Sequence, residues 1–205
     1  IVLQKGLLSY HHSRNGWEGY VCHISVSTIH GGERSQDKVS VATASEALLR
    51  GANGVSAQVN LGDKHESDMI ERLGELSRQA YLEGLPVLGM VYPRGPNLVI
   101  EKDDPTGGVA HAARIAWELG CHVVKVPWTG SPESFSKVVE AVPIPVLLAG
   151  GEKKGDFNRT LSILREAMAV GCSGVCFGRQ VFSSIDPESC VRSLREIVHG
   201  NENTL

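Results

Sequence analysis

Short apolar runs rich in Val, Ile and Leu recur along the chain, and each is about as long as a β-strand. Longer stretches with apolar side chains at three- and four-residue spacing separate several of these runs, which is the pattern of helices with one buried face. The runs cover residues 1–4, 20–26, 55–59, 87–91, 122–126, 146–149 and 174–177. The chain therefore alternates predicted strands with predicted helices.

Three of the predicted helices have clear signals. In residues 68–83 an apolar side chain returns on one helical face, and residues 156–170 show the same period. Thr106 is expected to cap a third helix, which Gly120 closes. A glycine also stands where the other helices give way to strands, at Gly51, Gly84 and Gly171. This repeated junction indicates a repeated βα unit.

Strands that alternate with helices form parallel sheets covered by helices. No G-x-G-x-x-G follows the first run, so the sequence lacks the main signature of an open dinucleotide-binding sheet. Seven units favour a TIM (β/α)8 barrel instead, with an eighth expected before Ile1, because the chain starts directly in an apolar run. We expect residues 1–205 to be a single barrel domain without its first βα unit.

Composition narrows the class of protein. Hydrophobic residues make up 41% of the 205 residues and the net charge is −3, with basic residues scattered, so nucleic acid is not an expected partner. No apolar run approaches the ~20 residues of a membrane span, and no secretory leader is visible, so a cytoplasmic location is expected. The five cysteines lack a C-x-x-C pair and are interpreted as reduced structural thiols: Cys22, Cys121, Cys172, Cys176 and Cys190.

Lys125 is the main candidate for chemistry, because barrel enzymes carry their active sites at the carboxyl ends of the strands. Val124 and Val126 face one side of its strand, so Lys125 faces the other, toward the barrel mouth. A lysine there can pair with a buried carboxylate, extend to water, or act as a nucleophile. We favour the nucleophile, because burial disfavours the charged ammonium and so favours the amine that attacks a carbonyl.

Tyr92 ends the preceding apolar run, beside the strand of Lys125, and is a candidate proton shuttle, although a tyrosine at that place can also be structural. Arg94 either holds an anionic substrate group or is a solvated loop charge. The last two runs end in Gly150-Gly151 and Gly178-Arg179. Bare backbone N–H groups there predict a phosphate site, since barrels often bind phosphate after strands seven and eight.

The histidines His11, His12, His23 and His30 raise the possibility of a metal site, as a zinc-dependent aldolase would need. They show no H-x-x-x-H or H-E-x-x-H spacing, and no cysteine joins them. We therefore expect neither a metal nor another cofactor.

Residues 124–135, which begin Val-Lys-Val-Pro-Trp-Thr-Gly, resemble the Schiff-base lysine segment of the class I, archaeal-type fructose-bisphosphate aldolase family. Residues 90–96, Met-Val-Tyr-Pro-Arg-Gly-Pro, resemble its tyrosine segment, and both glycine loops match as well. Residues 23–28 resemble the end of its third strand, which adds Ser27 to the substrate-binding candidates. The resemblance covers essentially the whole chain and implies a homo-oligomer.

The resemblance implies that Lys125 forms an iminium with a ketone, that Tyr92 is the general acid and base, and that the glycine loops with Arg179 hold a sugar phosphate. Met90, in place of the usual tryptophan, favours the 2-amino-3,7-dideoxy-D-threo-hept-6-ulosonate synthase branch. Pro127-Trp128 and Gln180 depart from the family pattern. The family's catalytic aspartate is expected before Ile1.

These residues predict a class I aldolase or transaldolase that joins a phosphorylated ketose or triose-derived ketone to an aldehyde such as L-aspartate semialdehyde. The enzyme that makes an aminohydroxybenzoate precursor uses related chemistry. Two alternatives stay open: a class I fructose-1,6-bisphosphate aldolase, and a barrel that binds a sugar phosphate without catalysis.

Overall fold

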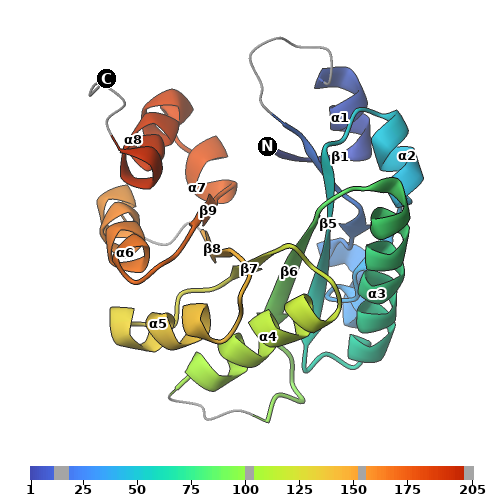
Figure 1. The fold of residues 1–205 in the computed structure, drawn as a ribbon, viewed down its shortest axis with the longest axis horizontal. Helices are drawn as coiled ribbons and strands as arrows, with labels where there is room; N and C mark the ends of the chain where they lie inside the picture. The colour runs from blue at the N-terminus through green and yellow to red at the C-terminus, as the bar shows by residue number, and fades with distance from the viewer. Residues whose placement is uncertain (12–18, 100–103, 152–155, 201–205) are drawn as a thin grey trace.

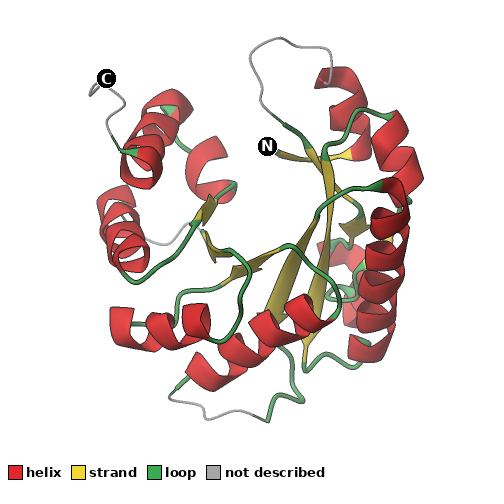
Figure 2. Cartoon of the chain, in the orientation of Figure 1, coloured by secondary structure: helices red, strands yellow, loops and turns green. Residues whose placement is uncertain are grey.

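The computed structural model describes residues 1–11, 19–99, 104–151 and 156–200. Seven parallel strands form one curved sheet in the order β1-β2-β5-β6-β7-β8-β9, and helices cover its outer side (Figures 1 and 2). The strands of this sheet are β1 (Val2–Gln4), β2 (Val21–His23), β5 (Gly54–Leu61), β6 (Val87–Pro93), β7 (Val123–Val126), β8 (Val146–Ala149) and β9 (Gly174–Cys176). This is the α/β, TIM-barrel-like fold predicted from the sequence.

The remaining elements connect these strands. The helices are α1 (Lys5–His11), the 3-10 helix η1 (Ile29–Arg34), α2 (Ala44–Leu49), α3 (Glu66–Glu83), α4 (Thr106–Glu118), α5 (Pro132–Glu140), α6 (Phe157–Ala169), α7 (Arg179–Phe182) and α8 (Pro187–His199). A small antiparallel sheet pairs β3 (Ser25–Val26) with β4 (Val39–Ser40). Within the described ranges, no helix has the length and apolarity needed to cross a membrane.

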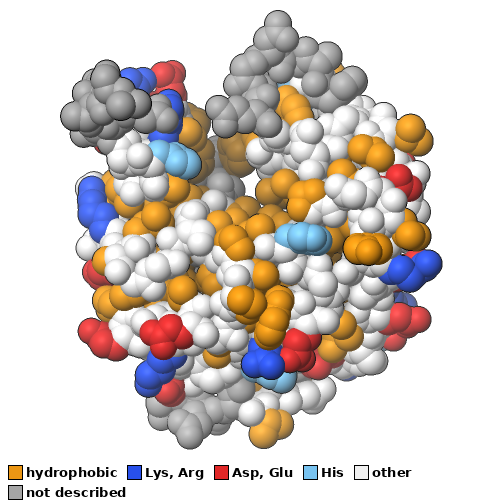
Figure 3. Space-filling view, viewed as in Figure 1, with side chains coloured by type: hydrophobic (Ala, Val, Ile, Leu, Met, Phe, Trp, Pro, Cys, Tyr) orange, Lys and Arg blue, Asp and Glu red, His pale blue; other side chains and the backbone are white. Residues whose placement is uncertain are grey.

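The core has two layers because side chains alternate across each strand. Outward-facing residues such as Val124 and Val126, both 0% exposed, pack under the helices. Leu88, Met90 and Tyr92 form a second cluster on the concave face. Figure 3 shows hydrophobic side chains across the middle of one face of the molecule, with charged side chains around its periphery. The concave face is where the site residues lie.

Three local predictions are tested by these elements. The junction glycines Gly51, Gly84, Gly120 and Gly171 all have positive φ, from 68° to 94°, as helix-ending glycines do. The run at residues 20–26 is not one strand, because the chain leaves the large sheet after His23 and pairs with β4 instead. The predicted cap at Thr106 is wrong. Thr106 is the first residue of α4, Pro105 precedes it as the cap residue, and Asp104 Oδ1 accepts the Thr106 N–H at 2.9 Å.

Candidate active site

A pocket of about 380 Å³ opens at the carboxyl ends of β6 to β9. Parallel strands bring these ends together, although the residues lie far apart in sequence. The pocket contains seven of the eight site residues selected from the sequence; only Ser27 is not among its lining residues. Its lining consists of Tyr92, Pro93, Arg94, Lys125, Pro127, Ala149, Gly150, Gly151, Cys176, Gly178 and Arg179.

Lys125 lies on β7 between Met90 of β6 and Leu147 of β8 in the strand register. Its side chain is half-buried and lines the pocket, while Val124 and Val126 are fully buried on the opposite face. The alternation predicted from the sequence is therefore present, and it directs the Lys125 amine into the pocket. A half-buried primary amine in this position can reach a ligand carbonyl there.

Tyr92 is 7% exposed and lies within hydrogen-bonding reach of the Lys125 side chain. Burial raises the pKa of Tyr92 above its ordinary value, while the positive charges of Lys125 and Arg94 act in the opposite direction. The Arg94 guanidinium carbon lies 4.5 Å from the centre of the Tyr92 ring. Because the net effect is a raised pKa, the phenol keeps its proton at neutral pH and can donate it to a ligand oxygen.

The two glycine loops meet on the other side of the pocket. Gln180 Nε2 donates to the Gly150 carbonyl at 3.1 Å and so joins the loop after β8 to α7. A side chain on Gly150 would place its Cβ 2.7 Å from Cδ1 of Phe177, so only glycine fits without movement. Glu152 and Lys153, which follow these glycines in sequence, lie outside the described residues. The described loops present a small, glycine-lined surface beside Arg179.

Ser27 lies in a different group of side chains. Its hydroxyl donates to the Ser35 carbonyl at 2.7 Å and accepts from Lys38 Nζ at 2.5 Å. Arg94 lines the pocket, and its positive charge lowers the pKa of Lys38 in this group. The sequence did not single out Lys38, because nothing in the pattern of residues 27–38 shows where this connection lies relative to the strands.

His23 is a further residue that the sequence analysis did not assign to the site. Its Nδ1 lies 2.9 Å from Ser56 Oγ, and its Nε2 lies 3.3 Å from Ser25 Oγ. Burial lowers the pKa of His23 to about 4, and the charges of Lys125 and Lys38 act in the same direction. The imidazole is therefore neutral near pH 7. The two-residue period from Val21 to His23 would have indicated that His23 faces the concave side.

Three of the four histidines that raised the possibility of a metal site, His11, His23 and His30, lie in the described residues. Across the described part of the chain, no three His, Cys, Asp or Glu side chains are grouped so that they could hold a metal ion. His23 hydrogen-bonds to Ser56 and Ser25, which agrees with the interpretation that the histidines make local hydrogen bonds. His12 lies outside the described residues.

Comparison with known proteins gives a consistent result. Residues 1–184 match the family described as DeoC/LacD family aldolase. The chain is 37% identical to a 2-amino-3,7-dideoxy-D-threo-hept-6-ulosonate synthase of Halobacterium salinarum, over 97% of the chain and 73% of that protein. It is 40% identical to a second protein of this name from Archaeoglobus fulgidus, over 88% of the chain but only 66% of the relative. A Streptomyces griseus 2-amino-4,5-dihydroxy-6-oxo-7-(phosphonooxy)heptanoate synthase is 34% identical over 98% of the chain and 73% of that protein.

Solved structures agree with the sequence relatives. An archaeal fructose 1,6-bisphosphate aldolase superposes with a TM-score of 0.87 at 32% identity, covering 98% of this chain and 78% of the other. A second archaeal structure, with its catalytic lysine covalently bound to the carbinolamine intermediate of the substrate, gives the same TM-score at 30% identity, over 97% of this chain and 77% of the other.

Proposed function

Because the chain belongs to the DeoC/LacD family of aldolases, we propose that it joins a phosphorylated ketose or triose-derived ketone to an aldehyde such as L-aspartate semialdehyde. The chain is a class I, Schiff-base aldolase by family. The observation that carries the proposal is that the Lys125 amine, the Tyr92 phenol and both glycine loops line the same pocket.

In this proposal the neutral Lys125 amine attacks the ketone carbon to give a carbinolamine, and loss of water gives an iminium. A base takes a proton from the adjacent carbon, or from the hydroxyl of a departing aldehyde fragment, and the electron pair left on that carbon forms an enamine. The enamine carbon then forms a bond to the incoming aldehyde carbon, and the Tyr92 phenol donates a proton to the aldehyde oxygen. Water hydrolyses the new iminium, which releases the product. The proton set free when the Lys125 amine is regenerated returns the Tyr92 phenolate to the phenol.

The glycine loops with Arg179 would hold the phosphate of the ketone. Backbone N–H groups without a neighbouring side chain allow close approach of an anion, and a guanidinium forms strong, paired hydrogen bonds with phosphate oxygens. Anchoring the phosphate at β8 and β9 would place the ketone carbon near the end of β7, where Lys125 lies.

The names of the sequence relatives support the synthase reaction, as does Met90. Fructose-1,6-bisphosphate aldolase is the second candidate, supported by the 0.87 TM-score with the archaeal aldolases. Cleavage of fructose 1,6-bisphosphate and condensation with L-aspartate semialdehyde, assayed side by side on the full-length protein, separate the two reactions. The homo-oligomer and the cytoplasmic location stay predictions.

The mechanism is tested by reduction with borohydride in the presence of dihydroxyacetone phosphate, followed by peptide mass spectrometry. We expect a covalent adduct on the peptide that contains Lys125. Lys125→Met should abolish the adduct and reduce turnover by on the order of 10³-fold or more. The exposed Lys137 provides a matched control, and Lys137→Met should retain both.

An adduct on a different lysine would refute the assignment of Lys125. Sugar-phosphate binding without any adduct or turnover in the full-length protein would favour the non-catalytic alternative instead.

A further inference from the structure

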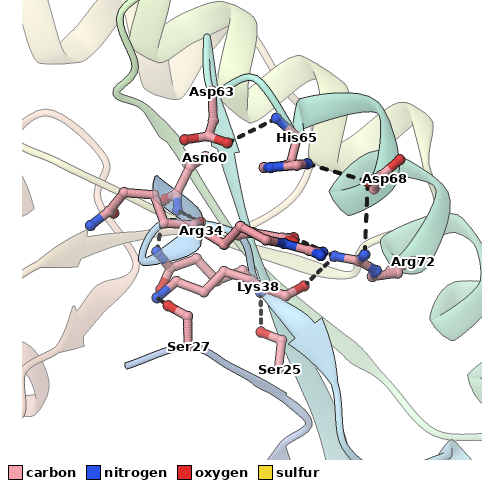
Figure 4. A network of polar contacts seen from close by, with 12 residues as sticks. Ser25, Ser27, Arg34, Lys38, Asn60, Asp63, His65, Asp68 and Arg72 are labelled. Atoms are coloured by element: carbon pink, nitrogen blue, oxygen red, sulfur yellow. Dashed lines mark hydrogen bonds and ion pairs between the residues drawn. The ribbon is translucent and has the colours of Figure 1, made fainter. Parts of the chain in front are cut away.

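The connection between Ser27 and Lys38 is held in place by side chains from two other elements (Figure 4). Arg72 of α3 donates from Nη1 to Asp37 Oδ1 at 2.6 Å and to the Lys38 carbonyl at 3.0 Å. Asn60, at the end of β5, donates from Nδ2 to the Gln36 carbonyl at 2.7 Å. These contacts fix the backbone on both sides of Lys38, so that its side chain starts from a defined position.

Asp37 is the centre of this arrangement. It is 2% exposed and accepts hydrogen bonds from Arg72 and from Arg34, whose Nη2 lies 2.5 Å from Oδ2. Burial alone would raise the pKa of Asp37, but the two guanidinium groups hold it below its ordinary value. Arg34 and Arg72 are therefore both paired with a carboxylate, and Arg72 also lies 4.0 Å from Asp68 Oδ2.

The Lys38 ammonium differs from Arg34 and Arg72, which pair with Asp37. Its hydrogen-bond acceptor is the Ser27 hydroxyl, and no carboxylate of the described residues lies at ion-pair distance. By contrast, Lys5 pairs with Glu46 and Lys64 pairs with Glu33. An ammonium has three N–H donors, so two remain for a ligand.

The strand register places the connection that carries Lys38 beside the pocket. Asn60, which holds the Gln36 carbonyl, is in register with the lining residue Tyr92 on the neighbouring strand. Burial lowers the pKa of Lys38, and the positive charge of Arg94, a lining residue, acts in the same direction. The positive charges of both Lys125 and Lys38 lower the pKa of His23. Two like charges held near each other destabilise the empty site and favour an anion that contacts both.

We propose that Lys38 and Arg94 bind the anionic end of the aldehyde substrate, so that Lys38 determines specificity for charged over uncharged aldehydes. This inference rests on the proposed function. The glycine loops after β8 and β9 take the phosphate of the ketone, and Asn60 of β5 anchors the connection that carries Lys38. Tyr92 on β6 and Lys125 on β7 lie between these two places in the strand order. The bound ketone would therefore present its reactive carbon to an aldehyde whose anionic group, carboxylate or phosphate, extends toward β2 and β5.

The test measures aldehyde specificity in the full-length protein with dihydroxyacetone phosphate as the ketone donor. L-aspartate semialdehyde and glyceraldehyde 3-phosphate supply a carboxylate and a phosphate, and glyceraldehyde is the uncharged acceptor. Lys38→Met should raise KM for at least one charged aldehyde by roughly tenfold more than KM for glyceraldehyde, since a charge-assisted hydrogen bond is lost. Lys38→Arg should recover most of this preference, and Lys137→Met should behave as the unmodified protein.

A purely structural role for Lys38 predicts a different result. If Lys38 only braces the connection through Ser27, then Lys38→Met and Ser27→Ala should impair all three aldehydes to the same degree. That outcome, or an unchanged preference in Lys38→Met, would overturn the proposal.

Binding of hexitol phosphates separates this proposal from failure of the proposed reaction, because these ligands cannot form a Schiff base. A hexitol 1,6-bisphosphate should bind roughly tenfold or more tightly than the monophosphate, and Lys38→Met should remove that difference. If Lys38→Met removes this affinity difference but the unmodified protein forms no Lys125 adduct, the anion site is supported and the aldolase mechanism is rejected. A difference that survives in Lys38→Met would reject the anion site.

Discussion

The Tyr92 phenol is nearly inaccessible to water, has the Lys125 amine within reach and carries the Arg94 guanidinium over its ring. The two cations would favour a phenolate, yet burial outweighs them and raises the pKa of Tyr92. The phenol is thus kept as a proton donor beside an amine. The proposed proton donation to the aldehyde oxygen uses this combination.

Tyr92→Phe removes the proton donor and keeps the ring on which Arg94 stacks. We expect kcat to fall by about 100-fold or more, because a positioned general acid contributes on the order of 10² to 10⁴ in rate. The borohydride adduct at Lys125 should still form. Steady-state kinetics check the first expectation and mass spectrometry the second, with the exposed Tyr81→Phe as control. A kcat near that of the unmodified protein would exclude Tyr92 as the acid.

Alternation along a strand was sufficient to predict where Lys125 and Tyr92 face, because each lies in an apolar run of clear period. Ser27 shows the limit of that reasoning. The resemblance placed it among the substrate-binding candidates, but its hydroxyl contacts Ser35 and Lys38, and Ser27 is not among the residues that line the pocket. Lys38 has no apolar neighbours of regular period, and only the path of the connecting chain brings it near Arg94.

At the scale of elements, the sequence predicted all seven strands of the large sheet, since each is an apolar run of strand length. It did not predict that the run at residues 20–26 divides after His23. Apolar residues continue on both sides of His23, and Ile24 is 2% exposed, while the pairing partner changes from β5 to β4. The change of partner depends on where the later segment β4 lies, and the residues of the run itself carry no information about that.

Gly150→Ala tests the junction between β8 and β9. The new Cβ would overlap the Phe177 ring, so the loop or the ring must move. We expect a loss of about 1 to 3 kcal/mol in the free energy of unfolding and an increase of roughly tenfold in KM for the phosphorylated ketone. Urea unfolding and steady-state kinetics measure the two effects.

The control is Gly74→Ala in α3, where no heavy atom lies within 4 Å of the added Cβ. That substitution should stabilise the protein slightly or leave it unchanged, because alanine is the better helix former. An unperturbed KM in Gly150→Ala would remove the loop after β8 from the phosphate site.

Over the whole molecule, the sheet separates an apolar layer under the helices from a concave face with ionisable groups. His23 and Lys125 both lie on the concave side, where Lys125 lines the pocket and the described hydrogen-bond partners of the His23 ring are two serines. A buried His23 surrounded by positive charge resists protonation. This property makes the stability of the entire fold depend on pH.

The pKa of His23 is about 4 in the folded protein and near 6.5 in the unfolded chain. The unfolded chain therefore binds the proton more readily. The free energy of unfolding should therefore fall by about 1.4 kcal/mol per pH unit as pH drops from 6.5 to about 4, and this contribution should level off below pH 4. Urea unfolding between pH 4 and 8 measures the slope.

His23→Gln should remove this part of the slope, since glutamine does not titrate and can hydrogen-bond to the nearby serines. The exposed His111→Gln is the control and should keep it. Identical slopes in all three proteins would show that His23 protonates equally well in the folded and unfolded states.

The alternation of side chains along β7 links correct strand register during folding to formation of the site. If β7 paired with its neighbours one residue out of step, Val124 and Val126 would enter the pocket and Lys125 would point into the apolar layer under α4 and α5. Burying an unpaired ammonium there would cost several kcal/mol, a large fraction of the stability of a typical domain. Misaligned chains are therefore disfavoured during folding itself. Completion of the hydrophobic core and delivery of the amine to its working position are a single event.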